Sequence, residues 1–489
     1  MTFADMIQKQ QSITYTENGA LAYNTTCDPL VDLFAVCGAM RRRSDEDITL
    51  HFSKAMIEDK QLATRLAFYT RDVRGGLGER RTGRLMFRHL AVNYPDIFAK
   101  NIGYIAEFGR WDDLVYLLYD APDLIVPLIG RQLKQDIESK NRGESISLLA
   151  KWLPSVNTSN RDTVQKGRYL AAKLGMSERQ YRKTLSGLRA YLKVVEVDLS
   201  AKRYSDIVYQ AVPSKAMTKY REAFRRNDGD RFREYLSKVQ KGEAKINSSV
   251  LYPYDIVERY LYNDPYKDVV SVHDDPVLEE QWRALPNYVQ GDERFLVMAD
   301  VSGSMYGRPM ATSIGLAIYF AEHNKGPFAN KFMTFSSRPE LVTIKGASLR
   351  ERIAGVYNAD WMMNTDLEAA FRLVLDTAVK NKVPQDELPT SIVVITDMEF
   401  DSCTSLDQGF YEQMSALFEA NGYHIPNIVF WNVNSHKDTF HASYDLKGVQ
   451  LASGQSATVF KTLVNDSCPT PYEYMLSVLN DERYQIITV

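Results

Sequence analysis

The chain has 489 residues, a formal net charge of −3, and 45% hydrophobic and 25% charged residues, the composition of an ordinary soluble globular protein. Its length predicts about two to four domains, and no apolar run approaches the roughly 18 residues that a membrane span requires. The start lacks the order of a secretory signal and the four cysteines form no CxxC pair, so we expect a cytoplasmic protein with no membrane partner, disulfide framework or zinc site.

Residues 1–289 are predicted to be helical. Apolar residues recur at i, i+3 and i+4 through 47–73, 81–120, 121–145 and 177–228, with short polar breaks between the segments. Successive helical pairs of this kind predict an all-α, HEAT-like solenoid, which can close into a ring. Since no strict repeat is visible, any repeats are expected in the structure rather than in the sequence, and an irregular bundle remains an alternative.

Residues 290–489 are predicted to form a second, α/β domain, because Pro and Gly gather at 275–293 and strand and helix signals alternate after them. Near-continuous apolar strands predict a doubly wound, mostly parallel sheet with helices on both faces. Strands are expected at 295–301, 330–337, 340–345, 390–400, 427–434 and 448–454, and helices at 309–323, 365–380 and 411–420.

The two predicted parts of the chain differ in net charge. Residues 291–489 hold 15 Lys/Arg and 24 Asp/Glu, a net −9, whereas residues 1–290 hold 44 and 38, a net +6. Residues 161–245 alone hold 21 and 10, a net +11. This split predicts an anionic partner for the helical part, although Lys and Arg that only solvate helical faces would give the same pattern.

Oxygen-bearing side chains follow two of the predicted strands. Asp300 ends the first strand, with Ser302 and Ser304 after it, and Asp397 ends the strand "SIVVITD". Because ligands of open α/β sheets sit beyond the carboxyl ends of strands, both carboxylates should meet at one rim, which Thr365 can also reach. Such a set suits Mg²⁺, or Mn²⁺ or Ca²⁺, and not zinc. The alternative for Asp and Ser here is a helix N-cap.

The motifs "DVSGSM", "NTD" and "VVITD" together resemble the metal-ion-dependent adhesion site of von Willebrand factor A domains. The resemblance implies that Asp300, Ser302 and Ser304 form the first metal-binding loop, Thr365 the second and Asp397 the third. Met398 stands where the family often has glycine, and Asn364 replaces the usual glycine before Thr365. Asp366 is a substitute ligand for Thr365.

Motifs of the helical part, among them "RDVRGGLGERR", "FGRWDDLVYLL" and "AKWLPS", resemble a largely uncharacterised family of plants, fungi and phages. That family joins a helical region to a C-terminal von Willebrand A domain. The architecture is similar to that of TROVE proteins such as the Ro autoantigen, a ring of helical repeats that binds small and misfolded RNAs. The resemblance implies a ribonucleoprotein role, although fold alone does not fix function.

Candidate RNA contacts lie in the basic segment. We select Arg182, Lys183, Arg189, Arg225 and Arg226 because Lys and Arg neutralise phosphates. Tyr220, Phe224, Phe232 and Tyr235 alternate with cations and can stack on bases, but aromatics at this spacing more often form core. The basic, glycine-rich stretch 71–81 lacks the phosphate-loop pattern, which favours a turn between helices where Gly75, Gly76 and Gly78 take positive φ.

These features favour a non-catalytic, RNA-binding scaffold of Ro-like type with a divalent-metal site. The alternative is a metal-dependent adhesion or assembly module, in which the ion accepts a carboxylate from an acidic protein partner and no nucleic acid is bound. An enzyme is less favoured: none of the seven His lies in an HExxH pattern, and Asp397, Glu399 and Asp401 as an acidic nuclease site would be scattered by strand alternation.

Overall fold

The computed structural model describes residues 7, 9–261, 270–271, 273–289, 294–335, 338–359, 366–401, 410–463 and 469–489. A helical N-terminal part is followed by a six-stranded, mostly parallel sheet with its own helices, as the sequence predicts. No helix in the described ranges is both long and apolar enough to cross a membrane.

The helices of the first part are short, and many begin at a capping Asp, Ser or Asn or carry Pro in the first turn. In chain order they are α2 (Pro29–Val36), α3 (Asp45–Glu58), α4 (Lys60–Arg71), α5 (Arg80–Asn93), α6 (Pro95–Asn101), α7 (Ile105–Phe108), α8 (Trp111–Tyr116), α9 (Pro122–Asn141), α10 (Leu149–Trp152), α11 (Arg161–Lys173), α12 (Glu178–Tyr191), α13 (Val195–Ser200), α14 (Ser214–Asn227), α15 (Gly229–Gln240), α16 (Pro253–Val257) and α17 (Pro276–Arg283).

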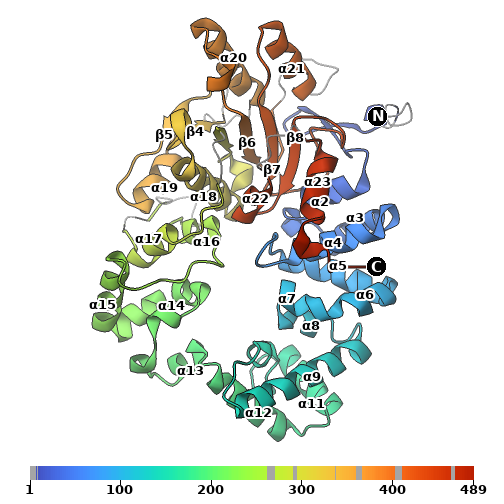
Figure 1. The fold of residues 1–489 in the computed structure, drawn as a ribbon, viewed down its shortest axis with the longest axis vertical. Helices are drawn as coiled ribbons and strands as arrows, with labels where there is room; N and C mark the ends of the chain where they lie inside the picture. The colour runs from blue at the N-terminus through green and yellow to red at the C-terminus, as the bar shows by residue number, and fades with distance from the viewer. Residues whose placement is uncertain are drawn as a thin grey trace.

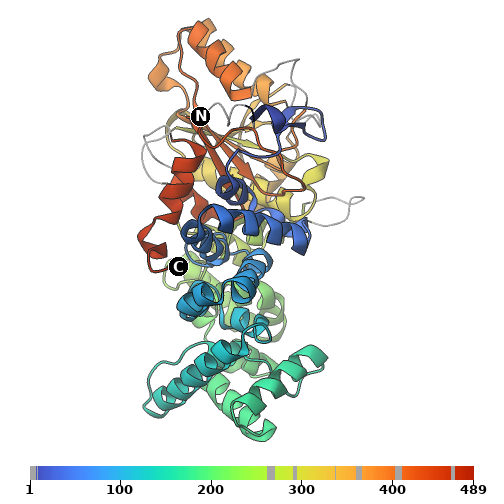
Figure 2. The same ribbon diagram turned by 90° about the vertical axis from the view of Figure 1, so that its right-hand side faces the viewer.

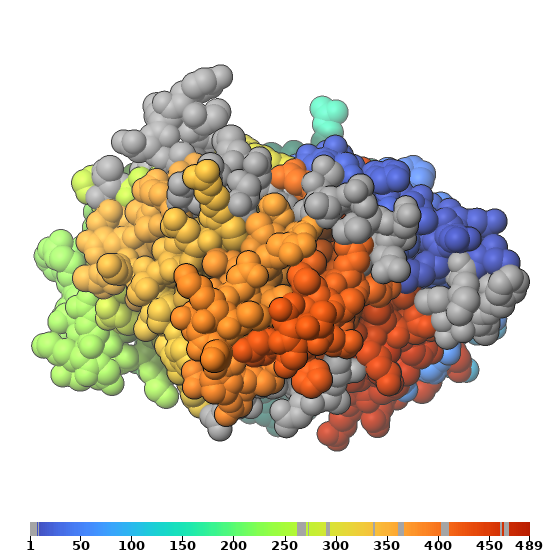
Figure 3. Space-filling model, turned by 90° about the horizontal axis from the view of Figure 1, so that it is seen from above, coloured from blue at the N-terminus to red at the C-terminus, as the bar shows by residue number. Residues whose placement is uncertain are grey.

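These helices run around a ring that the α/β part closes (Figure 1). Helices α2 to α8 descend on one side, α9, α11 and α12 lie farthest from the sheet, and α13 to α15 ascend on the other side. Figure 2 shows the same ring edge-on, with the sheet at one end. Seen from the sheet end, the orange and red α/β part lies between blue N-terminal residues and green helical residues (Figure 3).

The sheet has the order β5-β4-β3-β6-β7-β8, and only β5 runs antiparallel to its neighbour. Strands β3 and β6 are wholly buried, as expected of a parallel sheet covered on both faces. The strands are β3 (Phe295–Ala299), β4 (Lys331–Thr334), β5 (Leu341–Thr343), β6 (Ser391–Thr396), β7 (Asn427–Asn432) and β8 (Val449–Ser453); the helices are α18 (Arg308–His323), α19 (Leu349–Tyr357), α20 (Leu367–Asn381), α21 (Phe410–Ala420), α22 (Phe460–Leu463) and α23 (Pro471–Leu479).

Three elements were not predicted. A hairpin of β1 (Ile13–Tyr15) and β2 (Leu21–Tyr23) lies near the N-terminus, and α19 follows β5. The segment expected as a boundary, 275–293, contains α17, which Asp275 caps by accepting from the Val277 and Leu278 amides. The strands of the hairpin have three residues each, and α17 and α19 have eight and nine, so each element carries few periodic positions by which it could be recognised from the sequence.

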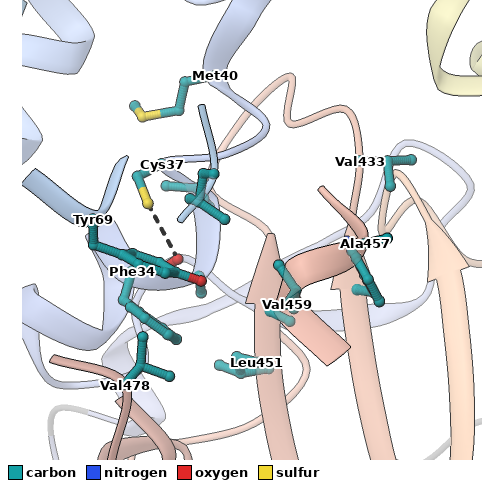
Figure 4. Packing of buried hydrophobic residues seen from close by; sticks show 14 of the residues in the cluster. Phe34, Cys37, Met40, Tyr69, Val433, Leu451, Ala457, Val459 and Val478 are labelled. Carbon is teal, nitrogen blue, oxygen red and sulfur yellow. Dashed lines mark hydrogen bonds between the residues drawn. The ribbon is translucent and has the colours of Figure 1, made fainter. Parts of the chain in front are cut away.

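One hydrophobic core runs through both parts of the chain. Figure 4 shows Phe34 and Tyr69, from α2 and α4, packed beside Leu451 and Val478 of the C-terminal part. The rings of Phe34 and Tyr69 stack with centroids 5.7 Å apart, and the Tyr474 ring meets Phe34 edge-on at 5.6 Å. Helices near the start of the chain therefore pack against β8 and the C-terminal helix α23.

Gly38, in the turn after α2, lies against the backbone after β8. A Cβ added at Gly38 would lie 2.5 Å from the Cα of Gly454. We expect Gly38→Ala to lower the free energy of unfolding by about 1–3 kcal/mol, because neither backbone can move away without disturbing the sheet. Urea unfolding measures the change. Gly103→Ala is the matched control, since a Cβ there meets nothing within 4 Å. Equal stability of the two variants would contradict this packing.

Candidate functional site

Asp300 and Asp397 lie side by side at the carboxyl ends of β3 and β6, which are adjacent parallel strands. The Asp300 amide donates to the Ile395 carbonyl at 2.9 Å, which continues the ladder to the strand ends. Both carboxylates are buried, with 2% and 3% exposure. The rule that parallel strands end at a common rim therefore placed these two residues correctly.

The first loop is ordered by Asp300 itself. One Asp300 oxygen accepts from the Ser302 amide at 2.8 Å and the other accepts from the Thr396 hydroxyl at 2.8 Å. The hydroxyl oxygens of Ser302 and Ser304 lie 3.1 Å apart, and Ser304 is exposed. Asp300, Ser302, Ser304 and Asp397 thus gather at one rim, whereas Thr365 lies outside the described residues.

Two observations show that this rim suits a cation. The Asp397 Oδ2 atom is buried and has no hydrogen-bond partner among the described residues, although buried carboxylate oxygens are usually satisfied. Burial, and then the charge of Asp397, raises the pKa of Asp300 to about 6. A hard divalent cation would pair with both carboxylates and with hydroxyl oxygens. In the described part of the chain no three His, Cys, Asp or Glu side chains converge as ligands, so such an ion would depend on hydroxyls and water.

The third loop keeps the backbone geometry of a glycine. Met398 has φ 71°, in the left-handed region that glycine favours. Nε2 of the buried His441 ring lies 3.0 Å from the Met398 carbonyl oxygen, and this contact holds the peptide group in place. In the second loop, the Asp366 carboxylate caps α20 by accepting from the Ala369 amide at 2.9 Å. Cap formation is the ordinary role of Asp at this position.

Glu399 faces the N-terminal hairpin, away from Asp397. Its carboxylate accepts from the Glu17 amide at 2.5 Å and from the Thr439 hydroxyl at 3.1 Å. Lys437 lies 3.6 Å from it. The carboxylate therefore has a structural role in joining the hairpin to the loop after β6.

The predicted RNA contacts occupy two separate surfaces. Arg182 and Lys183 are exposed on α12. Arg189, nearly two turns later, donates to the carbonyls of Ala150 and Leu153, each at 2.8 Å. It also donates to Ser155 Oγ at 2.8 Å, so its guanidinium ties α12 to the end of α10.

Arg225 and Arg226 lie on α14. Arg225 pairs with Glu222 at 3.1 Å and lies 3.7 Å from Asp275. Arg226 donates to the Glu222 carbonyl at 3.4 Å. Both are exposed, but the nearby carboxylates offset the positive charge of Arg225 and weaken the case for a phosphate contact there.

The stacking role suggested for the nearby aromatics is wrong. Phe224, Phe232 and Tyr235 are buried in a second hydrophobic cluster between α14 and α15, against which Tyr220 packs. Tyr209 lies 4.8 Å from the Phe232 ring centroid in the same cluster. Aromatics at helical spacing form core here, which was the alternative reading of the sequence.

A basic cavity of about 580 Å³ opens where the two sides of the ring approach the α/β part. Its lining comes from the α4–α5 turn, α7, α8 and α10 on one side, and from the start of α14, residues 250–254 and the start of α18 on the other. Among the described residues of the lining, Glu79 is the only acid. Eight cations line it, Arg41, Arg71, Arg74, Arg80, Arg81, Arg110, Lys215 and Arg308, with four aromatics, Trp111, Trp152, Tyr252 and Tyr254.

The glycine-rich stretch 71–81 is the turn between α4 and α5, as favoured from the sequence. Only Gly78 of its three glycines has positive φ, at 68°, so the expectation for Gly75 and Gly76 is wrong. Gly76 is required for close packing, since a Cβ there would lie 2.1 Å from the Tyr69 carbonyl oxygen. At Gly78 a Cβ would lie 2.5 Å from the Tyr252 hydroxyl. The turn thus touches residues from the other side of the ring.

Buried charges hold this turn in place. Asp72 accepts from the Arg483 guanidinium at 2.8 Å and from the Tyr484 hydroxyl at 3.1 Å. Asp113 pairs with Arg71 at 2.8 Å and with Arg84 at 2.6 Å. Because both carboxylates are fully buried, these pairs fix the relative positions of α4, α5, α8 and the C-terminal segment.

Two family models match the chain. Each is described as a domain of unknown function: the first (DUF2828) matches residues 16–123 and 158–292, and the second (DUF7788) matches residues 295–483. An uncharacterized protein of Acanthamoeba polyphaga mimivirus is 29% identical over 510 residues, which cover 96% of this chain and 87% of the viral protein. Together these matches extend over nearly the whole chain, and none of them names an activity.

The crystal structure of the Deinococcus radiodurans Ro (RSR) protein has a similar fold. The TM-score is 0.50 at 14% identity, over 94% of this chain and 100% of that chain. At this identity the likeness establishes the architecture alone, and it confirms that the chain has a Ro-like arrangement. The resemblance of the α/β part to von Willebrand A domains stays a prediction.

Three residues of the cavity lining were not predicted as candidate functional residues: Arg110, Trp111 and Trp152. They lie in "FGRWDDL" and "AKWLPS", which we used only to identify a resemblance. A Trp beside an Arg in a short interhelical segment was the available signal, since both residue types are frequent in nucleic-acid contacts.

Proposed function

We propose that the protein is a non-catalytic, RNA-binding scaffold of Ro-like type. The observation that carries this proposal is the cavity at the closure of the ring, with eight Lys or Arg and four Trp or Tyr against one acid in its lining. Cations neutralise phosphates and aromatic faces stack on unpaired bases, so this lining suits single-stranded RNA. The Ro-like architecture supports the proposal, and Arg182 and Lys183 are retained as outer contacts.

The test measures binding of a single-stranded RNA against salt concentration. We expect Arg74→Ala combined with Lys215→Ala, which removes one charge from each side of the cavity, to weaken binding. The slope of log affinity against log salt should become shallower by about 1.4, since each phosphate contact contributes about 0.7 for a single strand.

The matched control is Arg233→Ala combined with Lys238→Ala, on exposed positions of α15 outside the cavity. This control should leave the slope unchanged. RNA copurifying with the wild-type protein, seen as a raised 260/280 nm absorbance ratio that RNase removes, is a further expected result. Failure of the wild-type protein to bind RNA at low salt would refute the proposal.

The second part of the proposal is a divalent-metal site, with Mg²⁺ expected, held by Asp300, Ser302, Ser304 and Asp397. The unsatisfied Asp397 oxygen and the adjacent Asp300 carboxylate support it. A bound ion would supply a positive charge at the rim, where few charged ligands leave room for water or for an oxygen ligand from a partner. An acidic protein partner at this rim remains the alternative role for the site.

A further inference from the structure

Two arginines of the cavity have no carboxylate partner among the residues that the structure describes. Arg74 donates from Nη1 to the Glu107 carbonyl, and Arg110 forms no side-chain hydrogen bond or ion pair with any described residue. Each of the other six cations lies within ion-pair distance of a carboxylate: Arg41 of Glu79, Arg71 of Asp113, Arg80 of Asp112, Arg81 of Asp45, Lys215 of Asp255 and Arg308 of Glu258. Positive charge that the protein does not balance is therefore concentrated at Arg74 and Arg110.

Arg110 is positioned by contacts other than an ion pair. Its backbone amide donates to Asp113 at 2.9 Å, and its guanidinium lies over the Trp152 ring, 5.0 Å from the centroid. Burial, followed by the charge of Arg71, lowers the pKa of Arg110. A half-buried guanidinium among like charges is stabilised by an anion that supplies the missing acceptors.

The size of the cavity limits what can enter. A volume of about 580 Å³ falls within the range of about 300–1,000 Å³ typical of sites for single small ligands. Half-buried Trp111 follows Arg110 in the lining and offers an aromatic side chain on which one base can stack while its phosphate meets the guanidinium groups, whereas Arg110 and Lys151 lie over the Trp152 ring.

We propose that the cavity recognises a phosphomonoester attached to a nucleoside, with the phosphate held by Arg74 and Arg110 and the base stacked on Trp111. The inference rests on the proposed RNA-binding function and names the group that binds at its centre. The phosphate can belong to the end of an RNA chain or to a free nucleotide, which share this chemistry.

A terminal phosphate suits the pair of arginines better than a backbone phosphate does. A phosphomonoester carries a charge of about −1.5 to −2 at pH 7 and three terminal oxygens, whereas a phosphodiester carries a single charge. Two guanidinium groups can each form two parallel hydrogen bonds to such a group. Discrimination between the two phosphate forms is therefore the measurable consequence.

The experiment compares single-stranded RNAs of about eight nucleotides that differ only at one end, by fluorescence anisotropy. One pair carries a 5′-phosphate or a 5′-hydroxyl, and a second pair carries a 3′-phosphate or a 3′-hydroxyl. We expect one phosphorylated end to tighten binding by about tenfold, which corresponds to about 1.4 kcal/mol. In Arg110→Ala the ratio of the affinities for the phosphorylated and hydroxyl forms should fall to about one, whatever affinity for the hydroxyl form is lost with this cavity charge.

Two further variants separate recognition from folding. Arg110→Lys keeps the charge but not the planar fork of donors, so we expect part of the preference to remain. Arg233→Ala, at a side chain 71% exposed on α15, should keep the full preference. Circular dichroism should give the same melting temperature for Arg110→Lys and the wild-type protein.

Competition with adenosine monophosphate distinguishes the two sources. Displacement of the phosphorylated RNA by the nucleotide supports a free nucleotide as ligand, and resistance to it supports a chain end. If the wild-type protein binds phosphorylated and hydroxyl RNAs equally, the inference is wrong while the proposed function stands. If no RNA binds, the proposed function is wrong. Binding of adenosine monophosphate alone, measured by tryptophan fluorescence, would then support the inference, and no binding would refute it.

Discussion

Asp113→Ala is expected to lower the free energy of unfolding by about 3–5 kcal/mol. The Asp113 carboxylate is wholly buried and accepts from Arg71, Arg84 and the Arg110 amide at 2.6–2.9 Å. Removing it leaves the Arg71 guanidinium, which is only 1% exposed, without a counter-charge. Urea unfolding followed by circular dichroism measures the difference between the variant and the wild-type protein.

The control for Asp113→Ala is Asp230→Ala, because Asp230 also pairs with an arginine but is 98% exposed. An exposed pair of this kind contributes about 0–1 kcal/mol, so this variant should unfold almost as the wild type does. The double variant Asp113→Leu with Arg71→Met should recover part of the loss, since no unpaired charge remains at that pair. A loss below about 1 kcal/mol for Asp113→Ala would contradict the structural role of this carboxylate.

The same carboxylate connects stability to the proposed site. Asp113 holds the Arg110 amide, and Arg71 lines the cavity that Arg110 also lines. The α4–α5 turn is fixed from the opposite side by Asp72, Arg483 and Tyr484. The cavity is therefore built on buried ion pairs, and its shape does not depend on the ligand being present.

The α/β part was largely predictable from the sequence. Its strands are near-continuous apolar runs, which a sheet covered on both faces requires, and they alternate with recognisable helices. The meeting of Asp300 and Asp397 followed from one rule, that parallel strands end at a common rim. Neither inference needed knowledge of contacts between distant segments.

The helical part shows where such reasoning stops. Arg182 and Arg189 both lie in the basic segment and could not be distinguished from the sequence. In the structure, however, Arg189 donates hydrogen bonds to the carbonyls of Ala150 and Leu153. Phe224 and Phe232 lie among cations, but the helix faces that carry them turn inward. The period of a helix predicts that it has an apolar face and not which neighbour covers that face.

The cavity could not be predicted, because its lining depends on the closure of the ring. Arg74, Trp152, Lys215, Tyr252 and Arg308 lie far apart in the sequence and meet only in the folded chain. The contact of Gly78 with Tyr252, which brings the two sides together, has no sequence signal beyond the glycine itself. Convergence of this kind is a property of tertiary structure.

Asp300→Asn is expected to abolish stabilisation by divalent cations and to make the metal-free protein more stable than the wild type. Two buried carboxylates, at Asp300 and Asp397, repel each other when no cation lies between them. Asparagine removes one charge and keeps the shape. Its amide can still accept from the Ser302 amide, and the Thr396 hydroxyl can accept from it instead of donating.

The measurement is the melting temperature in EDTA and over a titration with MgCl₂ or MnCl₂. When the ion concentration is 100 times its dissociation constant, the free energy of unfolding of the wild-type protein should rise by about 2.7 kcal/mol, which raises the melting temperature. The melting temperature of Asp300→Asn should not change. In EDTA the folded wild-type chain binds the Asp300 proton more tightly than the unfolded chain, because the pKa is raised from 3.8 to about 6. Wild-type stability should therefore fall as the pH rises through about 6, and the variant should lose this dependence.

Asp386→Asn is the matched control, since Asp386 is an exposed carboxylate of the same α/β part. It should respond to the cation as the wild type does and should keep the wild-type pH dependence. The combination of higher metal-free stability with lost metal response separates a ligand from a residue that only supports the fold, because loss of a supporting residue lowers stability under both conditions. A variant that is less stable in EDTA and still responds to Mg²⁺ would show that Asp300 orders the first loop and holds no ion.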